Sequence, residues 1–154
     1  MDLNSIDFKA IRFLMAQGRM TWSELAGLLD LSAPATADRV RRLEERKVIK
    51  GYAALVEPDA IGCHLTAFIA VTLERPEHRA GFLERIRELP EIQECHHVTG
   101  EDDYLLKVRC RHTKDLEMLI SEQLKGLPGI LRTRTTIALS TLKETPILPM
   151  KHND

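Results

Sequence analysis

The sequence from Thr21 to Lys47 reads TWSELAGLLDLSAPATADRVRRLEERK, and it decides the fold of the first third of the chain. Thr21 and Glu24 fit a capping box, in which the hydroxyl accepts from a free backbone N–H and the carboxylate reaches back. A connection of about three residues ends at Ser32, which can cap a second helix. Pro34 then falls in the first turn, where its missing N–H costs nothing. The pattern therefore predicts two capped helices joined by a tight turn.

A further helix is expected upstream, over residues 6–17. Its spacing places Ala10, Ile11 and Leu14 on one face, and Gly18 follows where a left-handed cap would end the helix. The first third of the chain is thus predicted to be a three-helix unit.

The last of these helices is expected to end near Lys47 and to have an apolar and a charged side. Val40 and Leu43 are spaced to face inward. The opposite side carries Asp38, Arg39, Arg41, Arg42 and Arg46. A basic helix after a tight turn suits the major groove of DNA, although composition alone also allows a helical bundle with a solvated basic face. The combination of two caps, a short turn and grouped arginines favours DNA binding.

Charge is divided unevenly along the chain. Residues 32–50 hold six Lys or Arg against three Asp or Glu, whereas residues 51–154 hold 13 against 16. A basic segment beside an acidic remainder indicates that one part of the chain meets a polyanion and the other does not.

The rest of the chain changes to an alternation of strands and helices. The expected elements are a strand over 65–74, a helix over 78–89, strands over 92–99 and 104–111, a helix over 113–124 and a strand over 130–142. This β-α-β-β-α-β order is the ferredoxin-like arrangement, an antiparallel sheet with both helices on one face. The fold class is therefore α+β, with DNA-binding residues 1–50, a linker strand over 51–64, the ferredoxin-like domain over 65–142 and a tail over 143–154, expected to be partly ordered at best.

The face of the sheet away from the helices needs a cover. The apolar side chains available to it are Ala67, Ile69, Val71, Ile137 and Leu139. A second copy of the chain is the simplest cover, so we expect a homodimer.

Nothing in the sequence indicates a membrane or an exported protein. The longest apolar stretch is far shorter than the ~20 residues that span a bilayer, and the first residues lack the pattern of a signal peptide. Three widely spaced cysteines, Cys63, Cys95 and Cys110, are expected to be reduced thiols. The expected location is the cytoplasm.

Several motifs together resemble the Lrp/AsnC family of bacterial and archaeal regulators. These are L-A-x-x-L-x-L-S from Leu25 to Ser32, R-V-R-R-L-E from Arg39 to Glu44, I-K-G-Y from Ile49, E-I-Q-E-C-H from Glu91, and Gly100 followed by D-Y-L-L-K from Asp103. The resemblance runs from about residue 6 to residue 142. It implies a winged helix-turn-helix followed by an amino-acid-sensing domain, and a homodimer that assembles further, to an octamer in the family.

The expected partners are double-stranded DNA and a small amino-acid effector. Arg39 and Arg42 lie within one turn of each other and are expected to address base edges, where a bidentate pair with guanine contributes about 1–3 kcal/mol of discrimination. Ser32 and Pro34 stand at the helix start, near phosphate or base. Two further residues complete the candidate DNA-binding set. Asp38 can accept from a cytosine amine, but we favour a salt bridge to Arg41 or Arg42 one turn on. Arg41 is a candidate phosphate contact or a solvated charge. The family usually carries a polar residue where Ala33-Pro34-Ala35 stands.

The turn after the second predicted strand is the candidate effector site. Gly100 allows a ligand close to the backbone, consecutive turn N–H groups can hold a carboxylate, and nearby acids can hold an ammonium. The residues alone also fit an ordinary hairpin turn, but the resemblance implies an effector bound here, between subunits. The candidate residues are Val98, Thr99, Gly100, Asp102, Asp103 and Tyr104.

Three alternatives compete with this function: a metal site, an enzyme and an architectural DNA-binding protein. Neighbouring residues on a strand point to opposite faces, so Cys95 and His96 do not favour a metal site, and neither a metal nor another cofactor is expected. Some relatives are siroheme decarboxylases, for which His96 and His97 would be the candidates, but an enzyme has no need of an arginine-faced helix, so no catalytic residue is expected. An architectural protein that wraps DNA without a metabolite shares every DNA-facing residue and stays open.

Overall fold

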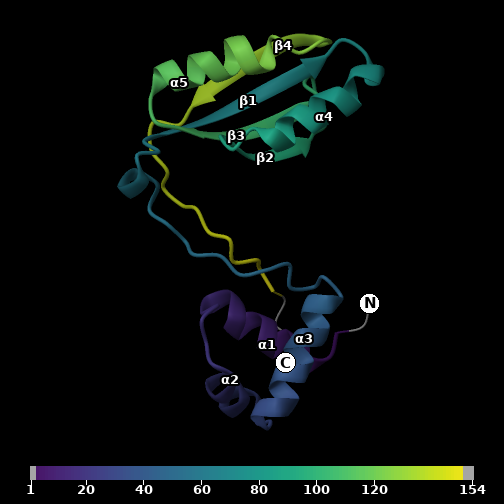
Figure 1. Ribbon diagram of the computed structural model, residues 1–154, viewed down its shortest axis with the longest axis vertical. Coiled ribbons are helices and arrows are strands. Elements are labelled where there is room, and N and C mark those ends of the chain that lie inside the picture. Colours follow the sequence, from purple (N-terminus) through teal and green to yellow (C-terminus); the bar gives the residue numbers. More distant parts are fainter. Residues whose placement is uncertain (1–2, 151–154) are drawn as a thin grey trace. The chain divides into compact units, whose positions relative to one another are not determined.

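A computed structural model describes residues 3–150 (Figure 1). Its contacts divide the chain into two compact units. The first comprises residues 3–55 together with 143–150, and the second comprises Val56–Leu142. The tail was expected to be partly ordered at best, yet residues 143–150 belong to the first unit, where Ile147, Leu148 and Met150 share a pocket with Arg12 and Met15. Residues 151–154 of the tail lie outside the described residues.

The first unit begins with helix α1, Ser5–Ala16. Asn4 caps it, because the Asp7 N–H donates to Asn4 Oδ1 over 2.9 Å and the Asn4 N–H donates to Asp7 Oδ2 over 3.0 Å. This reciprocal cap satisfies two otherwise unpaired amides and explains why the helix begins one residue before the predicted start.

Helices α2, Trp22–Leu29, and α3, Ala33–Glu45, form the predicted pair. The capping box is confirmed: the Thr21 N–H donates to Glu24 Oε2 over 2.8 Å, and the Glu24 N–H donates to Thr21 Oγ1 over 3.2 Å. The Ser32 cap is also confirmed, since the Ala35 N–H donates to Ser32 Oγ over 3.3 Å. Local hydrogen bonds therefore set the tight turn between the helices.

The three helices enclose a small apolar core. It contains Ala10, Leu14, Leu25, Leu29 and Val40, with Ile6, Phe13, Met20, Leu31 and Ile49 packed around it. After α3, the described chain forms no strand between residues 51 and 64, where a linker strand was expected; a 3₁₀ turn, Pro58–Ile61, lies there instead.

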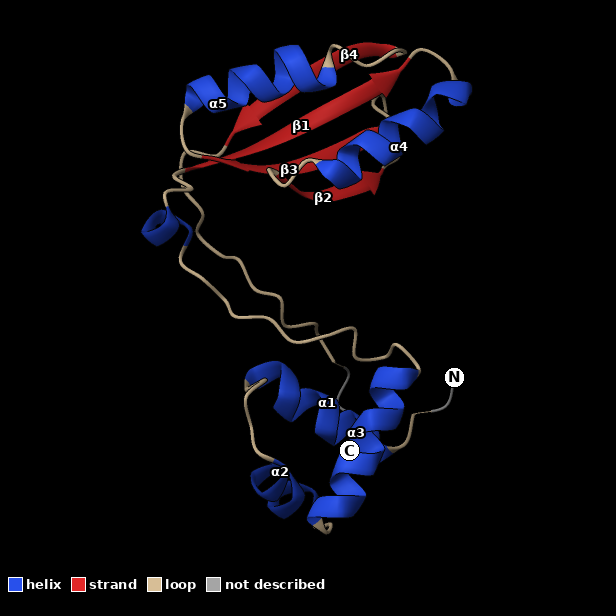
Figure 2. Ribbon diagram, viewed as in Figure 1, coloured by secondary structure: helices blue, strands red, loops and turns tan. Residues whose placement is uncertain are grey.

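The second unit is the predicted β-α-β-β-α-β arrangement (Figure 2). Its elements are β1 Leu65–Leu73, α4 Arg79–Glu88, β2 Ile92–His97, β3 Tyr104–Cys110, α5 Thr113–Met118 and β4 Ile130–Ile137. A short 3₁₀ turn, Pro76–His78, precedes α4, and a π-helical segment, Leu119–Leu124, continues α5. The strand order is β2-β3-β1-β4 and every pairing is antiparallel. Both helices cover the same face of this sheet (Figures 1 and 2).

The prediction of which apolar residues face away from the helices was wrong. Ala67, Ile69 and Val71 are completely buried in the core with Phe82 of α4 and Leu116 of α5. Ile137 lies opposite Ala67 and so shares its face, and Leu139 lies beyond the end of β4. Both sides of β1 carry apolar residues, because Phe68 and Ala70 alternate with Ala67, Ile69 and Val71, so their presence alone does not say which side the helices cover.

The outer face of the sheet, opposite the helices, is therefore built from other residues. Phe68 and Ala70 lie on it in β1, and Leu105 lies opposite Ala70 in β3. The Phe68 side chain is 37% exposed. Arg134 and Thr136 of β4 face the same way, because they pair with Ala70 and Phe68.

Candidate DNA-reading helix and effector loop

The outward side of α3 carries a carboxylate shared by two arginines. Asp38 accepts hydrogen bonds from both Arg41 and Arg42, one turn further along the helix. The two arginine side chains are 66% and 69% exposed. Partial burial raises the pKa of Asp38, but the hydrogen bonds and charges of Arg41 and Arg42 outweigh it, so the pKa lies below its usual value. Two guanidinium groups are thus held side by side on an exposed helix surface.

Arg39 has a different environment on the same helix. Its guanidinium donates to Asp7 Oδ1 over 2.6 Å and to Asn4 Oδ1 over 3.2 Å, both at the start of α1. Burial acts to raise the pKa of Asp7, whereas the Asn4 N–H and Arg39 lower it, and the net direction is down. Arg39 therefore joins α3 to α1, and a base contact by Arg39 stays a prediction.

Ser32 and Pro34 lie at the exposed N-terminal end of α3, as expected. The Ser32 hydroxyl accepts from the Ala35 N–H, so its oxygen serves the cap of the helix. The hydroxyl hydrogen can still be donated outward, toward a phosphate oxygen for example.

The candidate effector loop, residues 98–103, joins β2 to β3 and is attached to β1. The Asp103 N–H donates to the Val71 carbonyl over 2.9 Å, and the Leu73 N–H donates to Asp103 Oδ2 over 2.7 Å. The Val98 N–H donates to the Asp103 carbonyl over 3.0 Å, which closes the loop at its base. Asp103 is therefore used to hold the loop in place.

The tip of this loop is open. Thr99, Gly100 and Glu101 are exposed. Gly100 has φ +116°, a value that residues with a Cβ rarely adopt, and a Cβ placed there would meet no atom within 4 Å. The backbone at the tip is thus accessible to a ligand, whereas Asp102 and Tyr104 on either side of Asp103 are buried.

Asp102 is occupied by groups of its own unit. Thr72 Oγ1 donates to Asp102 Oδ1 over 3.1 Å, and Arg132 donates to the same oxygen over 3.4 Å. Arg134 donates to Asp102 Oδ2. The residue is 8% exposed. Asp102 therefore positions the loop against β4, and its oxygens already have donors where an effector's ammonium was expected.

Sequence reasoning missed the two arginines that hold Asp102. They lie 30 and 32 residues further along the chain, and only the pairing of β4 with β1 brings them to the loop. The one available signal was the R-T-R spacing at residues 132–134, which places two guanidinium groups on one face of a strand.

The two histidines considered for catalysis do not converge on one site. His96 pairs with Glu94 over 2.9 Å, and Glu94 pairs with Lys107 over 3.3 Å on the outer face. Hydrogen bonds from His96 lower the pKa of Glu94 against the effect of burial. His97 points to the other face, where it stacks on Tyr104 with ring centroids 5.1 Å apart.

Among residues 3–150, no three His, Cys, Asp or Glu side chains are grouped so that they could hold a metal ion. No helix in that range is both long enough and apolar enough to cross a membrane.

Comparison with known families assigns both units. Residues 3–50 match the family described as a winged helix-turn-helix DNA-binding domain, and residues 66–148 match the Lrp/AsnC ligand binding domain. The leucine-responsive regulatory proteins of Klebsiella pneumoniae and Escherichia coli K12 are 38% identical to this chain over 152 residues, which is 97% of this chain and 93% of theirs.

Solved structures give the same result. A transcriptional regulator from Neisseria meningitidis, in complex with L-methionine, superposes with a TM-score of 0.92 at 30% identity and covers 98% of this chain and 99% of its own. A feast or famine regulatory protein from Mycobacterium tuberculosis, also complexed with L-methionine, has a TM-score of 0.88 at 38% identity and covers 96% of this chain and 99% of its own.

Proposed function

Because the chain belongs to the Lrp/AsnC family of DNA-binding transcription regulators, we propose that α3 reads duplex DNA and that an amino acid bound at the loop 98–103 changes this binding. The observation that carries the DNA-binding part is the exposed pair of guanidinium groups at Arg41 and Arg42. Arginine forks fit both phosphate oxygens and the guanine edge, and a helix with such groups fits the major groove.

The residues of α3 divide into two roles. Arg41 and Arg42 contact DNA. Asp38 holds their guanidinium groups in place until these groups bind the duplex instead. Ser32 and Pro34, at the start of α3, contact the sugar-phosphate backbone of the DNA. Arg39 acts by fixing α3 against α1 through Asp7, so it contributes to DNA binding through the position of the helix.

The effector carboxylate is proposed to bind the N–H groups at the open tip, Thr99 to Glu101. Consecutive backbone N–H groups in a turn that includes a left-handed residue form a concave anion site. Val98 begins the loop and Tyr104 follows it, and Asp102 and Asp103 hold the loop in position. We place the ammonium end of the ligand against a second subunit, because the acids at the base of the loop already have donors. The two methionine-bound relatives support an amino acid as the class of effector.

The assembly is proposed to be a homodimer formed through the outer face of the sheet, with dimers joining into a larger ring such as an octamer. Phe68, 37% exposed at the centre of that face, supports this surface. Each dimer then offers two α3 helices to half-sites one helical turn apart or a multiple of it. The effector acts by differential affinity for two arrangements of subunits. We further propose that the protein works in the cytoplasm, without a catalytic step and without a metal or other cofactor.

A thermal-shift screen of the twenty amino acids tests the effector part, because a ligand that binds only the folded state raises its stability as occupancy rises. The expected result is a saturable rise for a small subset of amino acids, with L-methionine included in the panel. The same amino acids should then alter the affinity or footprint on a bound promoter fragment. If none of the twenty shifts either quantity, the protein is a ligand-independent architectural protein and the effector proposal is wrong.

The site of the effector is tested by Gly100→Asp. The substitution forces a Cβ onto a backbone with φ +116° and places a negative charge at the anion site. We expect loss of the ligand response with basal DNA binding retained. Gly81→Asp is the matched control, since Gly81 is exposed in the first turn of α4 and a Cβ there meets nothing within 4 Å. A response that survives in Gly100→Asp places the effector elsewhere.

A further inference from the structure

The second unit contains a pocket far from the effector loop. Its volume is about 540 Å³, and it lies at the end of β3, where the chain leaves Cys110. The effector loop is at the other end of the same strand, before Tyr104. Six residue steps of a strand separate these ends, which is roughly 20 Å. The pocket is thus a separate site, and its size lies within the usual range of about 300–1,000 Å³ for small-molecule sites.

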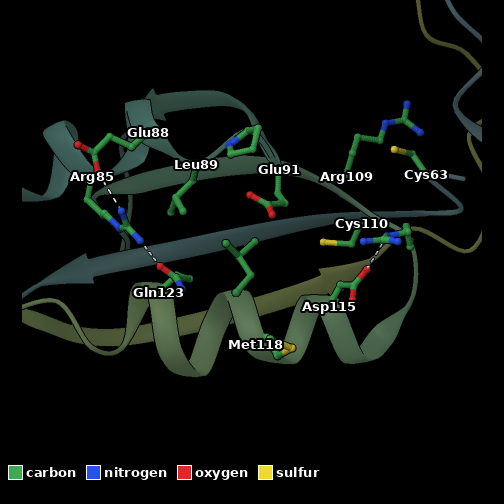
Figure 3. A pocket seen from close by; sticks show the side chains of 13 residues that line it. Cys63, Arg85, Glu88, Leu89, Glu91, Arg109, Cys110, Asp115, Met118 and Gln123 are labelled. Atoms are coloured by element: carbon green, nitrogen blue, oxygen red, sulfur yellow. Dashed lines mark hydrogen bonds and ion pairs between the residues drawn. The ribbon is translucent and has the colours of Figure 1, made fainter. Parts of the chain in front are cut away.

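The walls of the pocket combine apolar residues with charged ones. Leu89 follows α4, Cys110 ends β3, and Leu119 continues α5; each is at most 8% exposed. Met118, which is 47% exposed, also lines the pocket. The pocket therefore offers the body of a ligand contact with aliphatic and sulfur-bearing side chains (Figure 3).

Most charges around the pocket are already matched. At one end, Arg85 donates to Glu88 over 2.8 Å and also to Gln123. At the other end, Arg111 pairs with Asp115 over 3.5 Å. Figure 3 shows these two groups at opposite ends of the pocket, and neither of them extends into the space between.

Glu91 lies apart from both groups, and the remaining charged residue of the lining, Arg109, donates to Gln93 over 3.2 Å. The Glu91 carboxylate is directed into the central space, between Leu89 and Cys110 (Figure 3). Its Oε2 atom is sealed from solvent and accepts no hydrogen bond from any described residue. A polar atom that is sealed from water without a hydrogen-bond donor is costly, and an ammonium beside the carboxylate can supply that donor.

The thiol next to Glu91 does not compete for such a cation. Burial, and then the nearby carboxylates of Glu91 and Asp115, raise the pKa of Cys110 to about 11. Cys110 is therefore a neutral, apolar wall at physiological pH, and the Glu91 carboxylate is the acidic group beside it.

We propose that this pocket is a second ligand site, for a small organic cation with a primary ammonium on a short aliphatic chain. The ammonium pairs with the Glu91 carboxylate, and the methylene chain lies along Leu89, Leu119 and Met118. This site is independent of the proposed amino-acid site at the loop. Its wall includes Cys63, two residues before β1, so an occupant contacts the segment that enters the sheet.

Titration of the full-length protein with pentylamine, followed by NMR of the methyl groups of Leu89 and Leu119, tests the proposal. Pentanol and valerate have the same chain length with a neutral and an anionic head. We expect saturable shifts with pentylamine and affinity at least tenfold weaker for the other two. Equal affinity for pentylamine and pentanol, or no saturable shift with pentylamine, overturns the proposal.

Variants then test the role of Glu91. Glu91→Gln keeps the shape and removes the charge, and it should weaken pentylamine binding at least tenfold. Glu91→Asp retains the charge and should keep more affinity than Glu91→Gln. Glu88→Gln is the matched control at the rim, where the carboxylate is exposed and paired, and it should change the affinity less than twofold. Unchanged affinity in Glu91→Gln, with its fold checked by the dispersion of the same spectra, also overturns the proposal.

Two further experiments identify the class of the natural ligand and test whether the site is separate from the effector loop. L-Lysine and cadaverine carry the same alkylammonium with and without an amino-acid head, so their relative affinities distinguish an amino acid from a polyamine. Pentylamine should bind Gly100→Asp as tightly as the unmodified protein. Loss of binding in that variant assigns the shifts to the effector loop and refutes a second site, whereas failure of the amino-acid screen leaves the pocket result standing.

Discussion

Two carboxylates in this protein are each shared by two arginines, and their surroundings give them opposite roles. Asp38 on α3 binds Arg41 and Arg42 three and four residues away, and its side chain is 35% exposed. Asp102 in the effector loop binds Arg132 and Arg134 from β4, and its side chain is 9% exposed. Exposed ion pairs contribute little to stability and are screened by salt, whereas a buried carboxylate that loses its partners is costly.

A cluster of one aspartate and two arginines can thus form either a binding surface or a structural connection. Around Asp38, the arginines can exchange their partner for a phosphate or a base at small cost. Around Asp102, the same exchange would leave a buried carboxylate without donors and detach the loop from β4. Burial thus separates the groups that we propose to contact DNA from the groups that hold the candidate effector loop.

The largest effect is expected when the buried cluster of Asp102 with Arg132 and Arg134 is disrupted. Asp102→Asn removes the charge that Arg132 and Arg134 share, and should lower the free energy of unfolding by about 2 kcal/mol, below the full cost of a buried pair because the arginines are themselves exposed. Urea denaturation of the full chain measures it. The same variant should lose the effector response because the loop is no longer held.

Asp38→Asn is the matched comparison and should change the unfolding free energy by less than about 0.5 kcal/mol. If the two asparagine variants were equally stable, burial would not be what distinguishes the two clusters.

The next effect concerns DNA affinity. Arg42→Ala should weaken binding to a specific promoter fragment by about tenfold or more, as expected for loss of about 1–3 kcal/mol at a base edge. Stability should stay unchanged, because the side chain is 69% exposed. Gel-shift titration at fixed salt, with Arg87→Ala in α4 as a control for lost positive charge, measures the effect. Equal affinity of both variants would remove α3 from the DNA interface.

A smaller effect is expected for the connection between α3 and α1. Asp7→Asn and Arg39→Ala should each destabilise the first unit, and the double variant should reveal a coupling energy of about 0.5–1 kcal/mol. Because both variants disturb the contact that positions α3 against α1, both should also weaken DNA binding. Should Arg39→Ala weaken it while Asp7→Asn does not, Arg39 contacts DNA directly.

The smallest effect is a dependence on acid. The pKa of Asp7 is lowered in the folded protein, so its contribution to stability is complete above the unfolded pKa, near 3.9, and is lost as pH falls through the folded value. The stability difference between the unmodified protein and Asp7→Asn should therefore shrink steadily below about pH 4. A difference that stays constant down to pH 2 would show that the ionised form of Asp7 is not what stabilises the fold.

The architecture was largely predictable because its signals are local or periodic. The Thr21–Glu24 box and the Ser32 cap involve atoms within three residues of each other, and the β-α-β-β-α-β order follows from changes of period. The cap at Asn4 was not predicted, although Asn-x-x-Asp has the required spacing, because the apolar pattern begins only at Ile6.

The candidate site was predictable only in part. The partners of Asp38 follow from helical spacing, and the open glycine turn at residue 100 was identified directly. The assignment of Arg39 to the same exposed group, however, did not anticipate Asp7, and the assignment of Asp102 to the effector did not anticipate Arg132 and Arg134. These partners are about 30 residues away, and no period in the sequence connects them.

The sequence by itself determined the helices with their caps, the order of the strands, the family, and the pairs formed within one helical turn. The tertiary structure alone decided which face of β1 is buried, which arginine of α3 is committed to α1, and which acid of the loop is sealed. The physical reason is that an arginine or an aspartate has the same chemistry everywhere along a chain. Whether it binds a ligand or a neighbour depends on burial and on partners that only folding brings within hydrogen-bond distance.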